Sequence, residues 1–88
     1  IIHAVNRIAK IDPAVIVAAK CGNLRLLKYL NENGFDWHKN ACTYASFRGH
    51  LNCLQYAHEN GCPWSSDCAE SAAQGGHLEC LIYAHENG

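Results

Sequence analysis

The amino-acid sequence predicts an all-α protein, a solenoid in which helix pairs stack side by side. The first observation is a phrase that returns at a fixed spacing: residues 50–61 read HLNCLQYAHENG and residues 77–88 read HLECLIYAHENG, 27 residues further on. A looser copy, NLRLLKYLNENG, occupies residues 23–34, another 27 residues upstream. The second observation is that apolar residues follow a helical spacing in each copy, whereas no segment alternates as a strand would. Self-similarity of this kind is typical of stacked repeats.

The length and composition agree with a repeat architecture. A chain of 88 residues predicts a single domain, and a compact core of that size would be marginal unless each unit buries its apolar face on its neighbours. The longest apolar run, AVIVAA at residues 14–19, is far shorter than the roughly 18 residues of a membrane span, so we expect no membrane partner. All seven Lys and Arg residues lie in residues 1–48, where three acids leave a net charge of +4, and residues 49–88 carry five acids and no Lys or Arg. Neither half is basic enough to predict a nucleic-acid partner.

The first helix of each unit is predicted from its end signals. Residues 14–21, 41–48 and 68–75 are each followed by a glycine, which suits the left-handed position that closes many helices. Asp12 and Pro13 form a start signal for the first of these helices. Before them, residues 1–10 read as a short amphipathic helix, either a divergent unit or a terminal cap. We therefore expect one repeat domain over residues 1–88, divided into a divergent or capping helix at 1–12 and repeats at 13–34, 35–61 and 62–88.

The second helix of each unit begins at Asn23, His50 or His77 and ends at an Asn-Gly pair. Its leucines recur at the same positions in all three copies, and its apolar face covers more than half of the helix circumference. A polar strip remains, formed in the first unit by Arg25, Lys28 and Glu32. We expect this strip to lie on the outer, convex surface of the solenoid.

Short connectors join the units. Residues 35–39 and 62–66 each contain a tryptophan at the same place, Trp37 and Trp64. Asn40 and either Ser65 or Ser66 are candidates to cap the following helix with their side chains.

These residues resemble the ankyrin repeat. The resemblance rests on the segment AAQGGHL at residues 72–78, continued by the leucine-rich helix and the ENG at residues 86–88, and it covers residues 13–88. It implies a non-catalytic module that binds another protein on its concave surface. The period is 27 residues instead of about 33, so the connectors are expected to be too short for the β-hairpin fingers of ankyrin proteins.

Six cysteines and six histidines raise the question of a metal or redox site. His50 and Cys53, and likewise His77 and Cys80, lie one helical turn apart, but the first unit has Asn23 and Leu26 at these positions. The position therefore accepts an aliphatic residue, which favours Cys as a small buried hydrophobe over a zinc ligand. The other cysteines do not recur at equivalent positions of the repeat, so they predict no disulfide framework. We therefore expect reduced thiols and no cofactor, and an intracellular setting in the cytoplasm or nucleus.

The residues that vary between units are the better guide to function. Positions on one face of the first helix, flanked by the tryptophans, differ between the second and third units, and Phe47 is an aromatic residue at such a position. The candidate partner-binding residues are Trp37, Lys39, Asn40, Thr43, Phe47, Trp64, Ser66, Asp67, Glu70 and Gln74. The alternative is a solvated face, with the two tryptophans packing between units.

The leading hypothesis is a protein-binding module without catalytic activity. No glycine-rich phosphate loop follows a strand, and no nucleophile has a distinctive context. We expect the chain to be part of a longer one, with possible further repeats or domains. The first alternative is a structural or assembly element of a large multi-protein complex, and the second is a Cys/His zinc-binding module.

Overall fold

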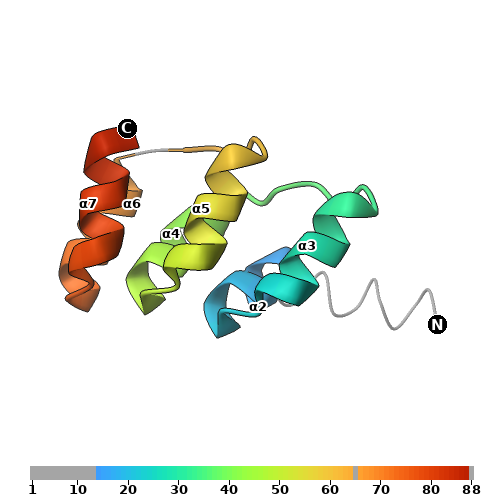
Figure 1. Ribbon diagram of the computed structural model, residues 1–88, viewed down its shortest axis with the longest axis horizontal. Coiled ribbons are helices and arrows are strands. Elements are labelled where there is room, and N and C mark those ends of the chain that lie inside the picture. Colours follow the sequence, from blue (N-terminus) through green and yellow to red (C-terminus); the bar gives the residue numbers. More distant parts are fainter. Residues whose placement is uncertain (1–13, 65, 88) are drawn as a thin grey trace.

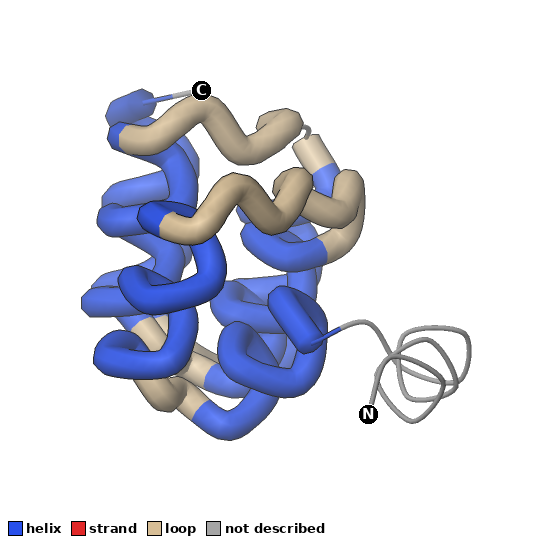
Figure 2. Tube along the Cα trace, turned by 90° about the vertical axis from the view of Figure 1, so that its right-hand side faces the viewer, coloured by secondary structure: helices blue, strands red, loops and turns tan. Residues whose placement is uncertain are grey.

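The computed structural model describes residues 14–64 and 66–87, and these form two layers of helices (Figures 1 and 2). The helices are α2 (Ala14–Cys21), α3 (Leu24–Glu32), α4 (Ala41–Arg48), α5 (Leu51–Glu59), α6 (Asp67–Gly75) and α7 (Leu78–Asn87). None of the described residues forms a strand, which confirms the all-α prediction and leaves connectors without β-hairpins. The helix expected at residues 1–10, the start signal at Asp12 and Pro13, and the cap at Ser65 lie outside the described residues.

The helices are short, from 8 residues in α2 to 10 in α7. At a rise of about 1.5 Å per residue they are roughly 12–15 Å long. None of the helices between residues 14 and 87 combines the length and the apolar character that crossing a membrane requires.

The first helices α2, α4 and α6 pack more closely on one another than the second helices α3, α5 and α7 do. Small side chains allow this approach: Ala18, Ala45 and Ala72, one per unit, are at most 1 % exposed. A stack curves toward the layer in which neighbouring helices are closer together, so the layer of first helices lies on its inner side. Arg25, on the opposite layer, is exposed, as expected for the outer strip.

The core lies between the two layers and between successive units. Leu27 and Leu54, at the same position of consecutive units, are its largest fully buried side chains, and small Ala and Cys residues fill most of the rest. Leu81, the third member of this series, is only half buried. The core is thus repeated along the stack, as nearest-neighbour stabilisation requires.

In the second and third units, a histidine contacts the unit before it. Gly22 adopts a φ of +72°, and the ring of His50 packs against it so closely that a Cβ added at Gly22 would lie 2.5 Å from Nδ1. His50 Nε2 also lies 3.0 Å from the carbonyl oxygen of Lys20. Gly49, with a φ of +77°, faces the ring of His77 in the same way. Glycine is therefore required here both for its backbone conformation and for the absence of a side chain.

The predicted side-chain caps of the first helices are wrong. Asn40 and Ser66 do occupy the N-cap positions of α4 and α6, but neither side chain makes a capping hydrogen bond. Their ψ angles, 3° and −19°, are those of a turn or helix, whereas a capping side chain needs a more extended backbone. In contrast, Asn23 has a ψ of 83° and its side chain accepts a hydrogen bond from the backbone N–H of Leu26 at 3.0 Å.

Candidate functional site

Eight of the ten predicted partner-binding residues lie in or immediately before the neighbouring helices α4 and α6. The two helices pack side by side. Across the junction, Thr43 approaches Cys68 and the backbone of Phe47 approaches Gly75. We call the set of Lys39, Asn40, Thr43, Phe47, Ser66, Asp67, Glu70 and Gln74 the first-helix surface.

Most of the first-helix surface faces solvent. The side chain of Phe47 is 44 % exposed although it is aromatic, and Lys39, Glu70 and Gln74 are exposed as well. Thr43 is half buried, since its Oγ1 lies 4.0 Å from Cys68 Sγ on α6. The close packing of α6 on α4 therefore removes part of Thr43 from the accessible surface.

The first-helix surface carries charges of opposite sign on its two halves. Lys39, a member of this surface, precedes α4 and is exposed, and Arg48, which lies outside the set, is an exposed base at the end of α4. Asp67 and Glu70 lie in the first turn of α6, where their negative charge is favourable to the helix dipole. A partner that crosses both helices thus meets a basic side, an exposed aromatic ring and an acidic side.

Trp37 packs on the second helix of its own unit. Its indole N–H donates a hydrogen bond of 3.0 Å to the carbonyl oxygen of Asn60, just after α5. Its ring lies 6.2 Å from the ring of Tyr56, centroid to centroid. The side chain of Asn31, in the unit before, donates to the hydroxyl of the same tyrosine at 3.0 Å. Trp37 therefore contacts the layer of second helices.

Trp64 repeats this arrangement one unit later. Its ring is 4.2 Å from that of His58 on α5 and 6.1 Å from that of Tyr83 on α7, measured between centroids. Tyr29 occupies the equivalent position in the first unit and is 60 % exposed. The residue 27 positions before Trp37 is a lysine, so the sequence supplies no tryptophan to cover Tyr29.

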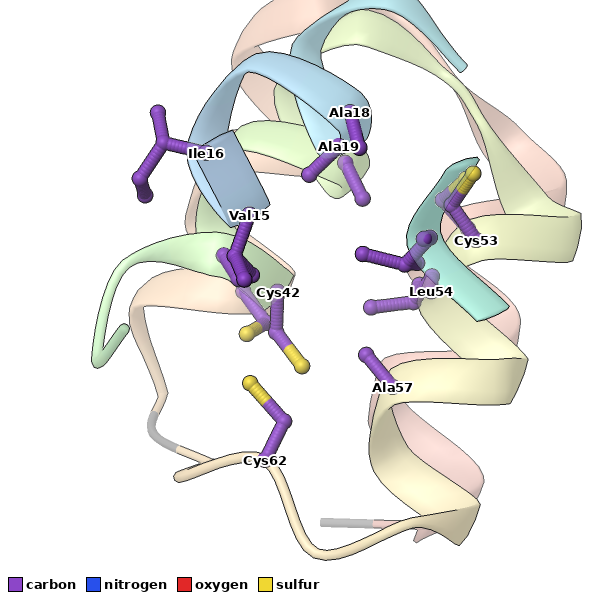
Figure 3. Close-up of a cluster of buried hydrophobic side chains, with 14 of the residues drawn as sticks. Val15, Ile16, Ala18, Ala19, Cys42, Cys53, Leu54, Ala57 and Cys62 are labelled. Atoms are coloured by element: carbon purple, nitrogen blue, oxygen red, sulfur yellow. The ribbon is translucent and has the colours of Figure 1, made fainter. Parts of the chain in front are cut away.

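Three cysteines from different elements meet at the junction between α4 and α6. Cys42 is in the first turn of α4, Cys62 is in the connector, and Cys68 is in the first turn of α6; all three are at most 4 % exposed. The side chains of Cys42 and Cys62 point toward each other (Figure 3), and Cys62 Sγ also donates to the carbonyl oxygen of His38 at 3.8 Å. We call these three residues the thiol cluster.

The sequence did not predict the thiol cluster. Comparing residues 27 positions apart finds only those at equivalent positions of the repeat. The three cysteines are not at equivalent positions: Cys42 corresponds to Val15, Cys62 to Phe35 and Cys68 to Ala41. Neighbours across a junction come from different positions of the repeat, so equivalence does not detect them. The usable signal was that a connector and two helix starts, which must meet when units stack, each carry a cysteine.

The two thiols that face each other differ in acidity. The thiol of Cys42 donates toward the sulfur atoms of Cys62 and Cys68, and this donation, together with burial, raises the pKa of Cys42 far above its usual value. The pKa of the Cys62 thiol is lowered, chiefly by the hydrogen bond from the Cys42 side chain and also by the backbone N–H of Cys42. That N–H lies in the first turn of α4, so the sulfur of Cys62 accepts from a helix start that Asn40 leaves uncapped.

The described residues contain no group of three or more His, Cys, Asp or Glu side chains arranged to hold a metal ion. The His-x-x-Cys pairs considered for zinc are divided between other contacts. Cys53 and Cys80 are each 1 % exposed within the core, and His50 faces the Lys20 carbonyl. All six cysteines are in the thiol form.

Comparison with known proteins supports the repeat architecture. A family model described as "Ankyrin repeats (many copies)" matches residues 15–58. This range covers α2 to α5 except the first residue of α2 and the last residue of α5, and it amounts to half of the chain. Comparisons with curated proteins and with solved structures found no match.

Proposed function

The chain belongs to the ankyrin-repeat family, and on that premise we propose that it is a non-catalytic module that binds another protein through the first-helix surface. The observation that carries this proposal is the placement of the residues that vary between units. They lie on the inner layer of the stack, where a partner can contact two units at once, and Phe47 is 44 % exposed among them. Proteins of this family generally act as interaction modules.

The first-helix surface sets the chemistry of the partner. Aromatic residues at the centre of a contact supply a large share of the binding free energy, so Phe47 would take an apolar side chain. Asp67 and Glu70 favour a partner with Lys or Arg residues on the α6 side. The expected partner is therefore a segment with an apolar residue that is followed, toward α6, by basic residues.

The proposal is tested by selecting binders from a library of displayed peptides on the immobilised chain. Each binder is then measured by calorimetry against the wild type and against Phe47→Ala, Glu70→Lys and Phe35→Ala. Phe35 is the matched control, because it is 43 % exposed but lies in the connector between α3 and α4. We expect Phe47→Ala and Glu70→Lys each to weaken binding at least about tenfold, or about 1.4 kcal/mol, and Phe35→Ala to have little effect.

Two results would count against the first-helix surface. One is that binders lose affinity equally with Phe35→Ala and Phe47→Ala, because exposure of any aromatic ring would then explain the binding. The other is that neither Phe47→Ala nor Glu70→Lys weakens any selected binder. Circular dichroism of each variant separates a lost contact from a lost fold.

A second candidate function is an assembly element of a larger complex, and the outer face of α7 favours it. Leu78 and Ile82, one helical turn apart, are 66 % and 46 % exposed. Ile82 also lines a groove of about 270 Å³ between α5 and α7, together with Leu51, Gln55, Glu79, Tyr83 and Glu86. Gel filtration distinguishes the two functions: an assembly element would self-associate through this face, and Ile82→Glu would restore the monomer.

A further inference from the structure

The thiol cluster lies at a junction where the repeat does not require cysteine. Equivalent positions in the preceding unit or units hold Val15 and Ala41, which are buried hydrophobic residues, and Phe35, which is exposed. Cys53 and Cys80, in contrast, recur at one repeat position in the second and third units. The three clustered cysteines are therefore not explained by packing at a shared position, and the side chains of Cys42 and Cys62 point toward each other (Figure 3).

We propose that Cys42 and Cys62 are a redox-active pair, which a small disulfide such as oxidised glutathione converts into an intrachain disulfide. The two side chains point toward each other across the boundary between α4 and the connector (Figure 3). Because the side chains already point toward each other, we expect the bond to close without rearranging the helix pairs. Each partner of Cys42 has one further contact: Cys62 Sγ donates to the carbonyl oxygen of His38 at 3.8 Å, and Cys68 Sγ lies 4.0 Å from the hydroxyl of Thr43.

Cys62 is the thiol that attacks first. It lies in the connector after α5, between exposed Gly61 and Pro63, and its backbone N–H donates to the carbonyl oxygen of Ala57 at 2.9 Å. Its side chain is 4 % exposed, so displacement of the connector alone brings it to solvent, whereas Cys42 is held within a helix. The lowered pKa of Cys62 places more of it in the thiolate form, which is the nucleophile.

The disulfide forms by two successive thiol–disulfide exchange reactions. The thiolate of Cys62 attacks one sulfur of oxidised glutathione, forming a mixed disulfide and releasing a glutathione thiolate. The thiol of Cys42 then attacks the Cys62 sulfur, and its proton leaves with the second glutathione. Two protein thiols are oxidised, one glutathione disulfide is reduced to two glutathione thiols, and the second step becomes easier because the Cys62 thiolate that raised the Cys42 pKa is gone.

The experiment uses the full chain in a Cys21→Ser background, since Cys21 is the exposed cysteine and could link two molecules. The protein is equilibrated with mixtures of oxidised and reduced glutathione, alkylated, digested and mapped by mass spectrometry. We expect the loss of two thiols and a single cross-linked peptide that contains Cys42 and Cys62. The oxidised protein should melt at a higher temperature than the reduced one, because the bond closes a loop of about 20 residues in the unfolded chain.

Variants identify the order of the steps. Cys42→Ala should stop at a mixed disulfide of glutathione on Cys62, Cys62→Ala should leave Cys42 reduced, and the control Cys53→Ala should form the cross-link as the parent does. A cross-link of Cys62 with Cys68 in the parent would overturn the proposal. So would a cross-link that forms only in denaturant, because the folded chain would then not bring the pair together.

Discussion

The contact between Gly22 and the ring of His50 makes a prediction that can be tested quantitatively. A Cβ added at Gly22 would lie 2.5 Å from Nδ1 and 2.6 Å from Cε1 of His50, well inside van der Waals contact. Gly22→Ala therefore has two costs. An alanine with a φ of +72° is strained by about 1–2 kcal/mol, and displacing or compressing the ring adds about 1–3 kcal/mol.

Gly76→Ala is the matched control for the backbone cost. Gly76 has a φ of +74°, but a Cβ added there would meet nothing within 4 Å. The strain and the loss of backbone entropy in the unfolded chain are common to both substitutions. We therefore expect Gly22→Ala to lower the free energy of unfolding by about 1–3 kcal/mol more than Gly76→Ala does.

A double-mutant cycle with His50→Ala isolates the steric part. His50→Ala loses the hydrogen bond with the Lys20 carbonyl, a cost of about 0.5–1.5 kcal/mol, but it also removes the ring. Adding Gly22→Ala to this variant should cost only the backbone strain, so the two substitutions should be less than additive. The assay is urea denaturation followed by far-ultraviolet circular dichroism. Equal costs for Gly22→Ala in the two backgrounds would refute the reasoning.

Two further predictions concern the buried polar and titratable groups. Ser46 is 0 % exposed, and its hydroxyl has no hydrogen-bond partner in the structure. Ser46→Ala should therefore raise the free energy of unfolding, measured by urea denaturation, by about 1 kcal/mol. A lower free energy of unfolding in the variant would contradict this. Burial raises the pKa of Cys53 above its usual 9.0. Above pH 9.0 the unfolded chain therefore loses a proton that the folded chain keeps, and stability falls as the pH rises. Cys53→Ala should lessen this fall by up to about 1.4 kcal/mol per pH unit, and an unchanged slope in urea titrations between pH 8 and 11 would contradict the role of Cys53.

The repeat spacing was sufficient to predict the helix pairs. Residues at equivalent positions can be compared directly, so Gly49 and Gly76 identified the ends of the first helices, and both adopt the left-handed conformation. The leucine series predicted which face of the second helix is buried, and Leu27 and Leu54 are indeed at most 1 % exposed. These features depend on local sequence and on burial within one unit, which the sequence records.

Features that depend on contacts between units were less accessible. The tryptophans could be assigned either to packing or to binding, and the ring of Trp64 packs across a junction, 4.2 Å from the ring of His58 in the preceding unit. Thr43 was predicted to lie on an accessible face, but the approach of α6 leaves it half buried. Asn40 failed as a cap because the cap depends on a backbone angle that residue type does not fix. In each case the outcome depends on a contact with another helix or on a backbone angle, and neither can be derived from the residue type alone.

The junction between α4 and α6 differs from the junction between α2 and α4, and the difference connects the two proposals. Gly75 comes so near to α4 that a Cβ added to it would clash with the carbonyl oxygen of Phe47, and the position equivalent to Gly75 in the preceding unit holds Arg48. The tight approach at this end of the two helices is thus specific to this pair of units. At their other end, Cys68 lies against Thr43, which belongs to the first-helix surface. Because the thiol cluster and the proposed binding residues share the same two helices, a covalent bond from Cys42 to the connector would restrain the α4 side of that surface, and oxidised and reduced protein should differ more in their affinity for a partner than in their helix content.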